Sequence, residues 1–321
     1  MTAPATPALR ARVGSVELPN PVMTASGTAG HGTELAAYGD LAELGAVVVK
    51  SLAVHEWPGN PPPRVHEVGA GMLNSVGLQG PGIDAWLARD LPALRDTGAR
   101  VVVSIWGRSV REYADAAARI AKAASDGAPI VAVEVNVSCP NVEDRARMFA
   151  HSAQATARVV EAAACGLPQW AKLSPNVPDI VEIAGAALGA GAEAVTLVNT
   201  LLGLALDLHT GQPLLGGGGG GLSGEPVHPV AVRAVWECRR AFPDASIVGV
   251  GGVFRAEDAL ELLVAGADAV QVGTATFRDP RAPWKVLHGM ARWCARHATT
   301  VDRLRSAAHG NRGAPSQRGA P

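Results

Sequence analysis

The amino-acid sequence predicts an α/β fold, namely a single (β/α)8 TIM barrel with long loops over its carboxyl-terminal face. Short apolar runs alternate with longer helical patterns along the chain, eight of each. Three of the runs belong to a weak internal repeat in which each strand ends on polar residues. Strict alternation favours a closed barrel over an open sheet, and polar strand ends indicate a shared functional face.

The predicted strands are runs of Val, Ile, Leu and Ala without polar alternation, which is typical of parallel strands covered on both faces. They lie at residues 21–25, 46–50, 100–105, 130–136, 169–173, 194–199, 246–250 and 269–272. The helical patterns that follow them lie at 33–44, 83–97, 109–125, 152–165, 178–190, 227–241, 255–265 and 282–296.

The internal repeat relates residues 44–51 (LGAVVVKS), 190–200 (AGAEAVTLVNT) and 265–274 (AGADAVQVGT). In each copy a helix ends at a Gly, which can adopt the left-handed conformation of a helix C-cap. An apolar strand follows and finishes on polar residues. Because the strand ends of a barrel converge on one face, these polar residues predict one shared site.

The composition is that of an ordinary globular protein, with 321 residues, 48% hydrophobic, 18% charged and a formal net charge of −1. Two domains would fit this length, but single barrels commonly reach about 250 residues or more. We therefore expect one catalytic barrel at 20–305, a loose arm at 1–19 and a disordered tail at 306–321. The charge gives no reason to expect nucleic acid or an anionic membrane as a partner.

Cysteine usage and hydropathy predict a cytoplasmic protein. No apolar run reaches the roughly 18–20 residues of a membrane span, and we find no signal peptide. The four cysteines are widely spaced, and none has the spacing of a zinc or iron–sulfur site. A reduced compartment and no metal are expected.

Two long connections follow strand ends and should lie over the site, because long loops at that face are more often functional than accidental. They span residues 52–82 and 200–226. The six glycines at 216–221 fit a plain flexible linker about as well as they fit a functional loop. Leu222-Ser223-Gly224, directly after them, is a more specific pattern than a linker requires.

Glycine-rich turns close the last two strands, at 249–252 and 273–275. Gly lets backbone N–H groups approach an anion, and barrels commonly bind phosphate after strands seven and eight. The turns predict a phosphate-bearing ligand, with tight turns alone as the alternative.

Two lysines, Lys50 and Lys172, follow apolar runs at strand ends, where an unpaired ammonium group would be costly. Either lysine could form a Schiff base, stabilise an anionic ligand or make a structural salt bridge. Four amides, Asn74, Asn136, Asn141 and Asn199, fall at the same face and could together bind a small polar heterocycle.

Cys139 differs from Cys165, Cys238 and Cys294, which lie on helical patterns and are interpreted as small buried apolar residues. Cys139 follows a strand end in the polar turn of NVSCPNV (136–142). A thiolate there could act as a nucleophile or as a base, and the residues alone do not choose between these roles.

Together these features resemble the dihydroorotate dehydrogenase family, from residue 20 to about residue 296. The motifs that carry the resemblance occur in the family's order: ASGTAG (25–30), VKS (49–51), NSVGLQGPG (74–82), NVSCPNV (136–142), AKLSPN (171–176), NT (199–200), GGLSGEP (220–226), GVGGV (249–253) and VGTA (272–275).

The resemblance implies FMN as the cofactor and dihydroorotate as the substrate, which is oxidised to orotate in pyrimidine biosynthesis. The residues implied to bind FMN are Ala25, Ser26, Gly27, Lys50, Ser51, Ser104, Asn136, Lys172, Val198, Gly224, Gly251, Gly252, Gly273 and Thr274. Those implied to bind the pyrimidine are Lys50, Asn74, Ser75, Val76, Gly77, Leu78, Asn136, Asn141, Asn199 and Thr200. Cys139 is implied to be the base that removes the C5 proton while hydride passes from C6 to the flavin, with Lys50 contacting both ligands.

The Cys base resembles class 1 of the family, and KLSPNV and GMLNSVGLQ resemble the NAD-linked class 1B catalytic subunit. This implies a homodimer that can form a heterotetramer with an iron–sulfur flavoprotein carrying FAD and [2Fe-2S]. The chain departs from the family's pattern in a charged lid at 143–149, and in Ser104 where many relatives have Asn.

Four alternatives remain open at this point. Two are related flavoenzymes: a fumarate-linked class 1A enzyme and a dihydropyrimidine dehydrogenase-like reductase. The others are a Schiff-base aldolase that uses Lys172 and a non-enzymatic ligand-binding barrel subunit.

Overall fold

The computed structural model describes residues 9–139 and 148–310. Its centre is an eight-stranded parallel sheet with the strand order β3-β14-β13-β10-β9-β8-β7-β4. A parallel bridge between Met23 and Ala46 joins the two outer strands and closes the barrel. The predicted (β/α)8 fold class is confirmed.

The barrel strands agree with the apolar runs of the sequence. They are β3 (Val22–Thr24), β4 (Val47–Val48), β7 (Val101–Ile105), β8 (Ile130–Asn136), β9 (Gln169–Lys172), β10 (Ala194–Leu197), β13 (Ser246–Val250) and β14 (Ala269–Val272). Nearly all of their residues are buried, as continuous apolar runs require.

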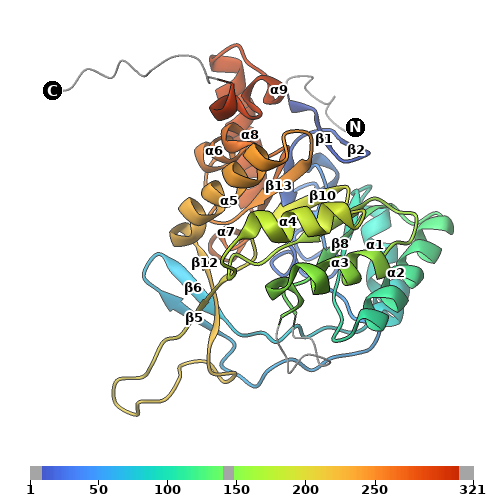
Figure 1. Ribbon diagram of the computed structural model, residues 1–321, viewed down its shortest axis with the longest axis vertical. Helices are drawn as coiled ribbons and strands as arrows, with labels where there is room; N and C mark the ends of the chain where they lie inside the picture. Colours follow the sequence, from blue (N-terminus) through green and yellow to red (C-terminus); the bar gives the residue numbers. More distant parts are fainter. Residues whose placement is uncertain (1–8, 140–147, 311–321) are drawn as a thin grey trace.

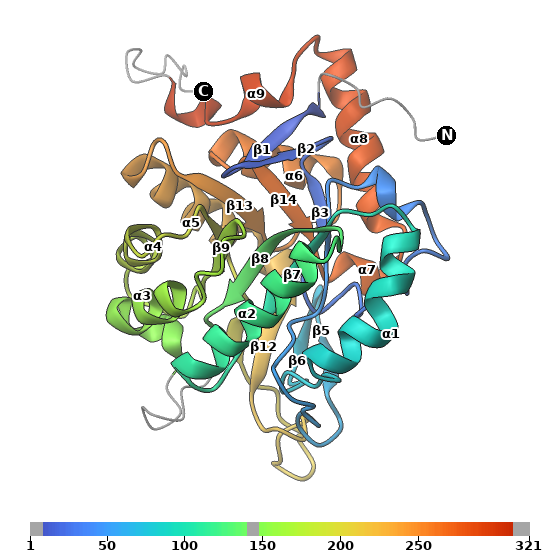
Figure 2. The same ribbon diagram turned by 90° about the vertical axis from the view of Figure 1, so that its right-hand side faces the viewer.

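Seven of the eight predicted helices form and surround the barrel (Figure 2). They are α1 (Ile83–Asp96), α2 (Val110–Ser125), α3 (Ala153–Ala162), α4 (Ile180–Gly189), α5 (His228–Ala241), α6 (Ala256–Ala265) and α8 (Ala282–Arg296). In α2 the buried residues Tyr113, Ala116, Ala117 and Ile120 follow helical spacing and face the barrel. The Ser109 side chain accepts a hydrogen bond from the Glu112 N–H and so caps this helix.

The predicted helix at 33–44 is wrong. The segment forms turns and a short 3-10 helix, η2 (Leu41–Glu43). Gly39 packs against the Trp284 ring, and the Asp40 side chain accepts from the Ala42 N–H to start η2. The Asp40 carbonyl also accepts from Trp284 Nε1 at 2.8 Å. These contacts with Trp284 of α8 hold the segment as turns and a short 3-10 helix instead of a continuous helix.

The expected loose arm is also wrong for residues 11–18. They form an antiparallel hairpin, β1 (Ala11–Val13) and β2 (Val16–Leu18). Its alternate residues are buried in a cluster with side chains at the amino-terminal end of the barrel, among them Val48, Val102 and Trp170. The hairpin therefore closes that end, opposite the four-stranded sheet described next (Figure 1).

The two long connections meet in one antiparallel sheet with the order β11-β12-β6-β5. Its strands are β5 (Val65–Val68), β6 (Gly71–Asn74), β11 (Leu201–Gly203) and β12 (Gly220–Gly224). The linker interpretation of 216–221 is thus wrong for Gly220 and Gly221, which pair with other strands. Side chains at these two positions would collide with Asn74 and Thr200, so glycine permits the close pairing.

After α8 the chain packs back on the barrel through α9 (Val301–Leu304) and η6 (Ala307–His309). Arg305 pairs with buried Asp268 at 2.7 Å, and His309 Nε2 contacts the Ala265 carbonyl at 2.9 Å. Residues 306–310 are therefore ordered where a tail was expected, and the rest of that tail lies outside the described residues. In the described part of the chain no helix has the length and hydropathy to cross a membrane.

Candidate active site

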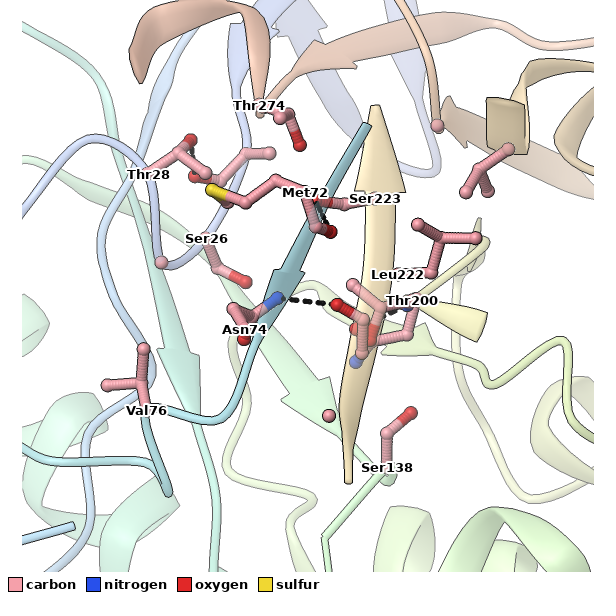
Figure 3. A pocket seen from close by; sticks show the side chains of 18 of the residues that line it. Ser26, Thr28, Met72, Asn74, Val76, Ser138, Thr200, Leu222, Ser223 and Thr274 are labelled. Carbon is pink, nitrogen blue, oxygen red and sulfur yellow. Dashed lines mark hydrogen bonds between the residues drawn. The ribbon is translucent and has the colours of Figure 1, made fainter. Parts of the chain in front are cut away.

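A cavity of about 540 Å³ lies between the carboxyl-terminal ends of the barrel strands and the four-stranded sheet. Its size is in the usual range for a small-molecule or cofactor site. Figure 3 shows Met72 and Asn74 on β6 and Leu222 and Ser223 on β12, with Ser26, Thr28 and Thr274 nearby. The cavity thus has a rigid barrel floor and a wall supplied by the two long connections.

The structure brings most of the predicted site residues together in this cavity. Its wall includes Ala25, Ser26, Gly27, Lys50, Ser51, Asn74, Ser75, Val76, Gly77, Leu78, Asn136, Lys172, Val198, Asn199, Thr200, Gly224, Gly251, Gly252, Gly273 and Thr274. Ser104 and Cys139 are fully buried behind the wall. Asn141 and residues 143–147 of the predicted lid lie outside the described residues, whereas Met148 lines the cavity.

A chain of hydrogen bonds links polar side chains from four barrel strands. Ser104 Oγ lies 2.8 Å from Ser51 Oγ, and Asn136 Nδ2 donates to Ser51 Oγ at 3.3 Å. Asn199 Nδ2 donates to Asn136 Oδ1 at 3.2 Å, and the Ser138 N–H donates to the same oxygen at 3.2 Å. The chain fixes the orientation of the Asn136 amide, and it places Ser104 behind Ser51 rather than at the cavity surface.

Lys172 lies almost completely buried at the cavity floor. Its Nζ donates to Ser26 Oγ at 3.1 Å and lies 3.8 Å from Glu134 Oε1. Gln271 Nε2 donates to the other Glu134 oxygen at 2.7 Å. A buried ammonium group needs such a counter-charge, and the arrangement leaves Lys172 as a fixed positive charge beneath any bound ligand.

Lys50 has a different environment at the edge of the cavity. Its Nζ donates to the Gln79 carbonyl and lies 3.4 Å from Gln79 Oε1. Burial and then the nearby positive charge of Arg64 lower the pKa of Lys50 to about 8. Lys50 is therefore a cation that an anionic ligand would stabilise further.

The glycine turns after β13 and β14 form a backbone-lined corner of the cavity. Gly251 and Gly252 have φ values of 136° and 67°, and both contact α5 so closely that a Cβ would meet Ala231 or His228. Gly273 lies against Ala25 in the same way. These turns bring backbone to the cavity wall at positions where the packing against α5 and Ala25 leaves little room for a side chain, which fits a phosphate group at this location.

Cys139 lies in an apolar cluster with Ala53, Trp106, Trp57 and Leu78. Its Sγ donates to the Asn136 carbonyl at 3.3 Å. Burial raises the pKa of the Cys139 thiol to about 12, although the neighbouring Tyr113 hydroxyl acts in the opposite direction. The thiol is protonated in this arrangement, directly behind the part of the wall formed by Leu78 and Ser138.

Several wall residues have no individual prediction from the sequence. Ser138 and Asn176 stand inside the motifs NVSCPNV and AKLSPN, so their neighbours could have drawn attention to them. The Ser138 Oγ is buried without a partner among the described residues, which leaves it able to bind a ligand. The others are Thr28, Val65, Met72, Met148, Ser174, Leu202, Gly203, Gly219, Gly220, Gly221, Leu222, Ser223, Val227, Val250 and Phe277.

Comparisons with known proteins give a consistent result. A family model described as "Dihydroorotate dehydrogenase" matches residues 8–293. The protein named "Dihydroorotate dehydrogenase B (NAD(+)), catalytic subunit" from Trichlorobacter lovleyi is 46% identical over 292 residues, which cover 90% of this chain and 94% of that protein.

Proteins with the same name from two further organisms are similar to nearly the same extent. The one from Pelobacter propionicus is 45% identical over 294 residues, covering 91% of this chain and 95% of the relative. The one from Desulforamulus reducens is 44% identical over 304 residues, covering 94% and 98%.

Proposed function

The chain belongs to the dihydroorotate dehydrogenase family, and from this premise we propose that it oxidises dihydroorotate to orotate with FMN as its cofactor. The observation that carries the proposal is the convergence of the separate family motifs on one cavity. Lys50, Asn136, Asn199 and the glycine turns come from distant parts of the sequence and line the same space.

The donor set fits FMN. The backbone corner at Gly251, Gly252 and Gly273 would hold the phosphate, and the fixed charge of Lys172 would face the ring system from the barrel floor. Ala25 and Val198 add apolar surface to the same cavity wall. When bound, FMN supplies the hydride-accepting chemistry, and the protein supplies binding and orientation.

The amides and Lys50 would hold the substrate. Asn74, Asn136 and Asn199 supply donors and acceptors of the kind that a pyrimidine ring requires, and their hydrogen bonds to neighbouring groups fix them in place. Lys50 supplies a positive charge for the substrate carboxylate. This pairing would distinguish dihydroorotate from a pyrimidine without a carboxylate, and so from the substrate of a dihydropyrimidine dehydrogenase.

Cys139 would act as the base. Its thiolate would take the proton from C5 of dihydroorotate, so that the C5–H bond breaks as an S–H bond forms. Asn136, whose Oδ1 accepts a hydrogen bond directly from Asn199, would hold the ring while this proton moves. The buried position of the thiol behind Leu78 and Ser138 keeps water away from it and requires that this wall shift when substrate binds.

We further propose the NAD-linked class 1B type, in which a partner subunit with FAD and [2Fe-2S] receives the electrons. The shared name of the relatives supports this choice over a fumarate-linked class 1A homodimer. The cysteines of this chain are too widely spaced to hold such a cluster, so the partner would supply it.

Flavin colour and its loss test the activity. Purified protein should be yellow with one FMN per chain, and anaerobic dihydroorotate should bleach it. Colourless protein that cannot be reconstituted with FMN contradicts the proposal. Cys139→Ala should remain yellow but lose most bleaching at neutral pH, and rapid bleaching by this variant would remove Cys139 from the base role.

The acceptor is tested separately by affinity purification from the native organism. Co-purification of an iron–sulfur flavoprotein, together with NAD-dependent turnover of the complex, is expected for class 1B. Turnover with fumarate by the isolated chain would instead assign class 1A.

A further inference from the structure

The backbone carbonyl of Asn136 accepts hydrogen bonds from two side chains at once. Tyr113 Oη donates to it at 2.7 Å, and Cys139 Sγ donates to it at 3.3 Å. Both donors are fully buried, and they come from different elements, α2 and the turn after β8. The phenol and the thiol therefore share one acceptor at the point where β8 delivers its residues to the site.

Packing holds the Tyr113 ring in this position. The ring meets Phe149 edge-on, with 5.6 Å between centroids and 89° between planes. The Phe149 N–H in turn donates to the Cys139 carbonyl at 3.2 Å. Tyr113 is thus tied to the Cys139 turn both through Asn136 and through Phe149, which leaves its hydroxyl little freedom beyond rotation about the C–O bond.

The proposed base must form a thiolate in surroundings that oppose it. The side chains clustered with Cys139 are Ala53, Trp106, Trp57 and Leu78, which offer the sulfur no charge. A thiolate cannot donate a hydrogen bond, so on losing its proton Cys139 loses its bond to the Asn136 carbonyl. A buried anion without a donor would be strongly destabilised.

Tyr113 can supply the missing donor. We propose that Tyr113 is a positioning residue for Cys139: its hydroxyl shares the Asn136 carbonyl with the thiol and turns to donate to the sulfur when the thiolate forms. The inference rests on the proposed function, in which Cys139 is the base. Tyr113 keeps its own proton throughout, while the proton from substrate C5 goes to Cys139.

Burial and the groups closest to Tyr113 favour its protonated form. Burial, and then the neighbouring Cys139, raise the pKa of Tyr113 well above its usual range, and Glu112 adds to the rise. The Glu112 carboxylate accepts from the Arg108 N–H at 2.7 Å, and Arg108 lies over the Trp57 ring at 4.9 Å. His55 meets the same indole edge-on at 6.0 Å. At working pH the phenol is therefore a donor.

The chain contains only two tyrosines, Tyr113 and the half-exposed Tyr38, which gives a matched pair of variants. Tyr113→Phe removes the hydroxyl and keeps the ring, and Tyr38→Phe makes the same change at the surface. We expect Cys139 in Tyr113→Phe to be about tenfold less reactive with iodoacetamide at a given pH below its pKa, because a hydrogen bond to the charged form is lost. Peptide mass spectrometry follows each of the four cysteines, and only Cys139 should change.

A second altered protein should change the reactivity of Cys139 in the opposite direction, so the test does not depend on whether Tyr113→Phe folds. Replacing tyrosine by 3,5-difluorotyrosine in the Tyr38→Phe protein labels Tyr113 alone and makes its hydroxyl a stronger donor. Cys139 should then become more reactive at neutral pH. An unchanged pH profile of Cys139 alkylation in both Tyr113→Phe and the fluorinated protein would overturn the proposal.

Flavin reduction separates a positioning role from a structural one. In Tyr113→Phe the rate of bleaching by dihydroorotate should fall about tenfold at pH 7 and approach the wild-type rate at high pH, with an unchanged substrate Kd. An equal loss at every pH, or equal changes at all four cysteines, would indicate general disruption and contradict the proposal. Alkylation requires no turnover, so its outcome stands even if Cys139→Ala shows that another group is the base.

Discussion

At the scale of single residues, two groups of the site have pKa values shifted in opposite directions. Burial raises the pKa of Cys139, the proposed base, to about 12, and burial with Arg64 lowers the pKa of Lys50 to about 8. Raising the pH therefore produces more of the thiolate and less of the charged lysine. Proton removal and carboxylate binding should respond to pH in opposite directions, so each can be measured alone.

The rate of flavin reduction at saturating dihydroorotate should rise with pH. Below a pKa of about 12 the thiolate fraction grows tenfold for each pH unit, and the rate should follow it across the neutral and mildly alkaline range. Anaerobic stopped-flow absorbance of the flavin measures this rate. A rate independent of pH would show that proton removal by Cys139 does not limit reduction.

Orotate binding should weaken as the pH rises above about 8. The free protein loses the Lys50 proton there, and a carboxylate binds the charged form better, so Kd should increase about tenfold per pH unit beyond that point. Spectral titration of the flavin gives Kd at each pH. Lys50→Met should bind orotate weakly and with no inflection near pH 8; a retained inflection would assign the titration to another group.

At the scale of elements, the site depends on glycines that let backbones approach. Gly252 has a φ of 67°, and a Cβ there would meet the His228 side chain and backbone. Gly252→Ala should therefore displace the turn after β13 and yield protein with less than about a tenth of the wild-type FMN content. Gly127→Ala is the matched control, because Gly127 also has a positive φ, 91°, but open space around it.

Absorbance of the purified proteins gives the FMN content. The control should keep its flavin and lose only about 1 kcal/mol of stability from backbone strain. Full flavin occupancy in Gly252→Ala would show that the turn after β13 does not hold the phosphate.

Elements whose signal is local could be predicted from the sequence. The barrel strands and seven helices were predictable because each carries its own apolar run or helical spacing. The four-stranded sheet was not, because β6 and β12 lie about 150 residues apart. β6 has only four residues and β12 is rich in Gly, so neither has a strand pattern alone. The place of Met72, Leu222 and Ser223 in the cavity wall depends on this pairing and was not predicted, although Leu222 and Ser223 belong to a motif that the sequence singled out.

The same distinction explains the remaining errors. The spacing at 33–44 resembles a helix, but contacts of Gly39 and Asp40 with Trp284, far along the chain, determine the turns. The hairpin at 11–18 has strands of three residues each, too short for an alternating pattern to be recognised. The polar strand ends, by contrast, lie together at one cavity as predicted, because barrel topology alone brings them together.

At the scale of the whole molecule, the two ends of the barrel have separate tasks. The carboxyl-terminal end carries the cavity with its two lysines, the thiol of Cys139 behind the cavity wall, and a sheet built from long connections. The amino-terminal end is closed by the β1–β2 hairpin, whose side chains belong to a core cluster distinct from that around Cys139. Changes at the closed end should therefore affect stability without altering the chemistry.

Leu18→Ala tests this separation. Leu18 is 2% exposed in the hairpin cluster, so its truncation should lower the free energy of unfolding by about 2–5 kcal/mol. Glu17→Ala is the neighbouring control, since the Glu17 side chain is 73% exposed and its change should stay within about 0.5 kcal/mol. Denaturant unfolding measures both values.

FMN content and the bleaching rate at low temperature should match wild type in both variants, because no hairpin residue lines the cavity in the described part of the chain. A Leu18→Ala protein that is fully folded yet bleaches slowly would show instead that the closed end of the barrel shapes the site, through the strands that run from one end to the other.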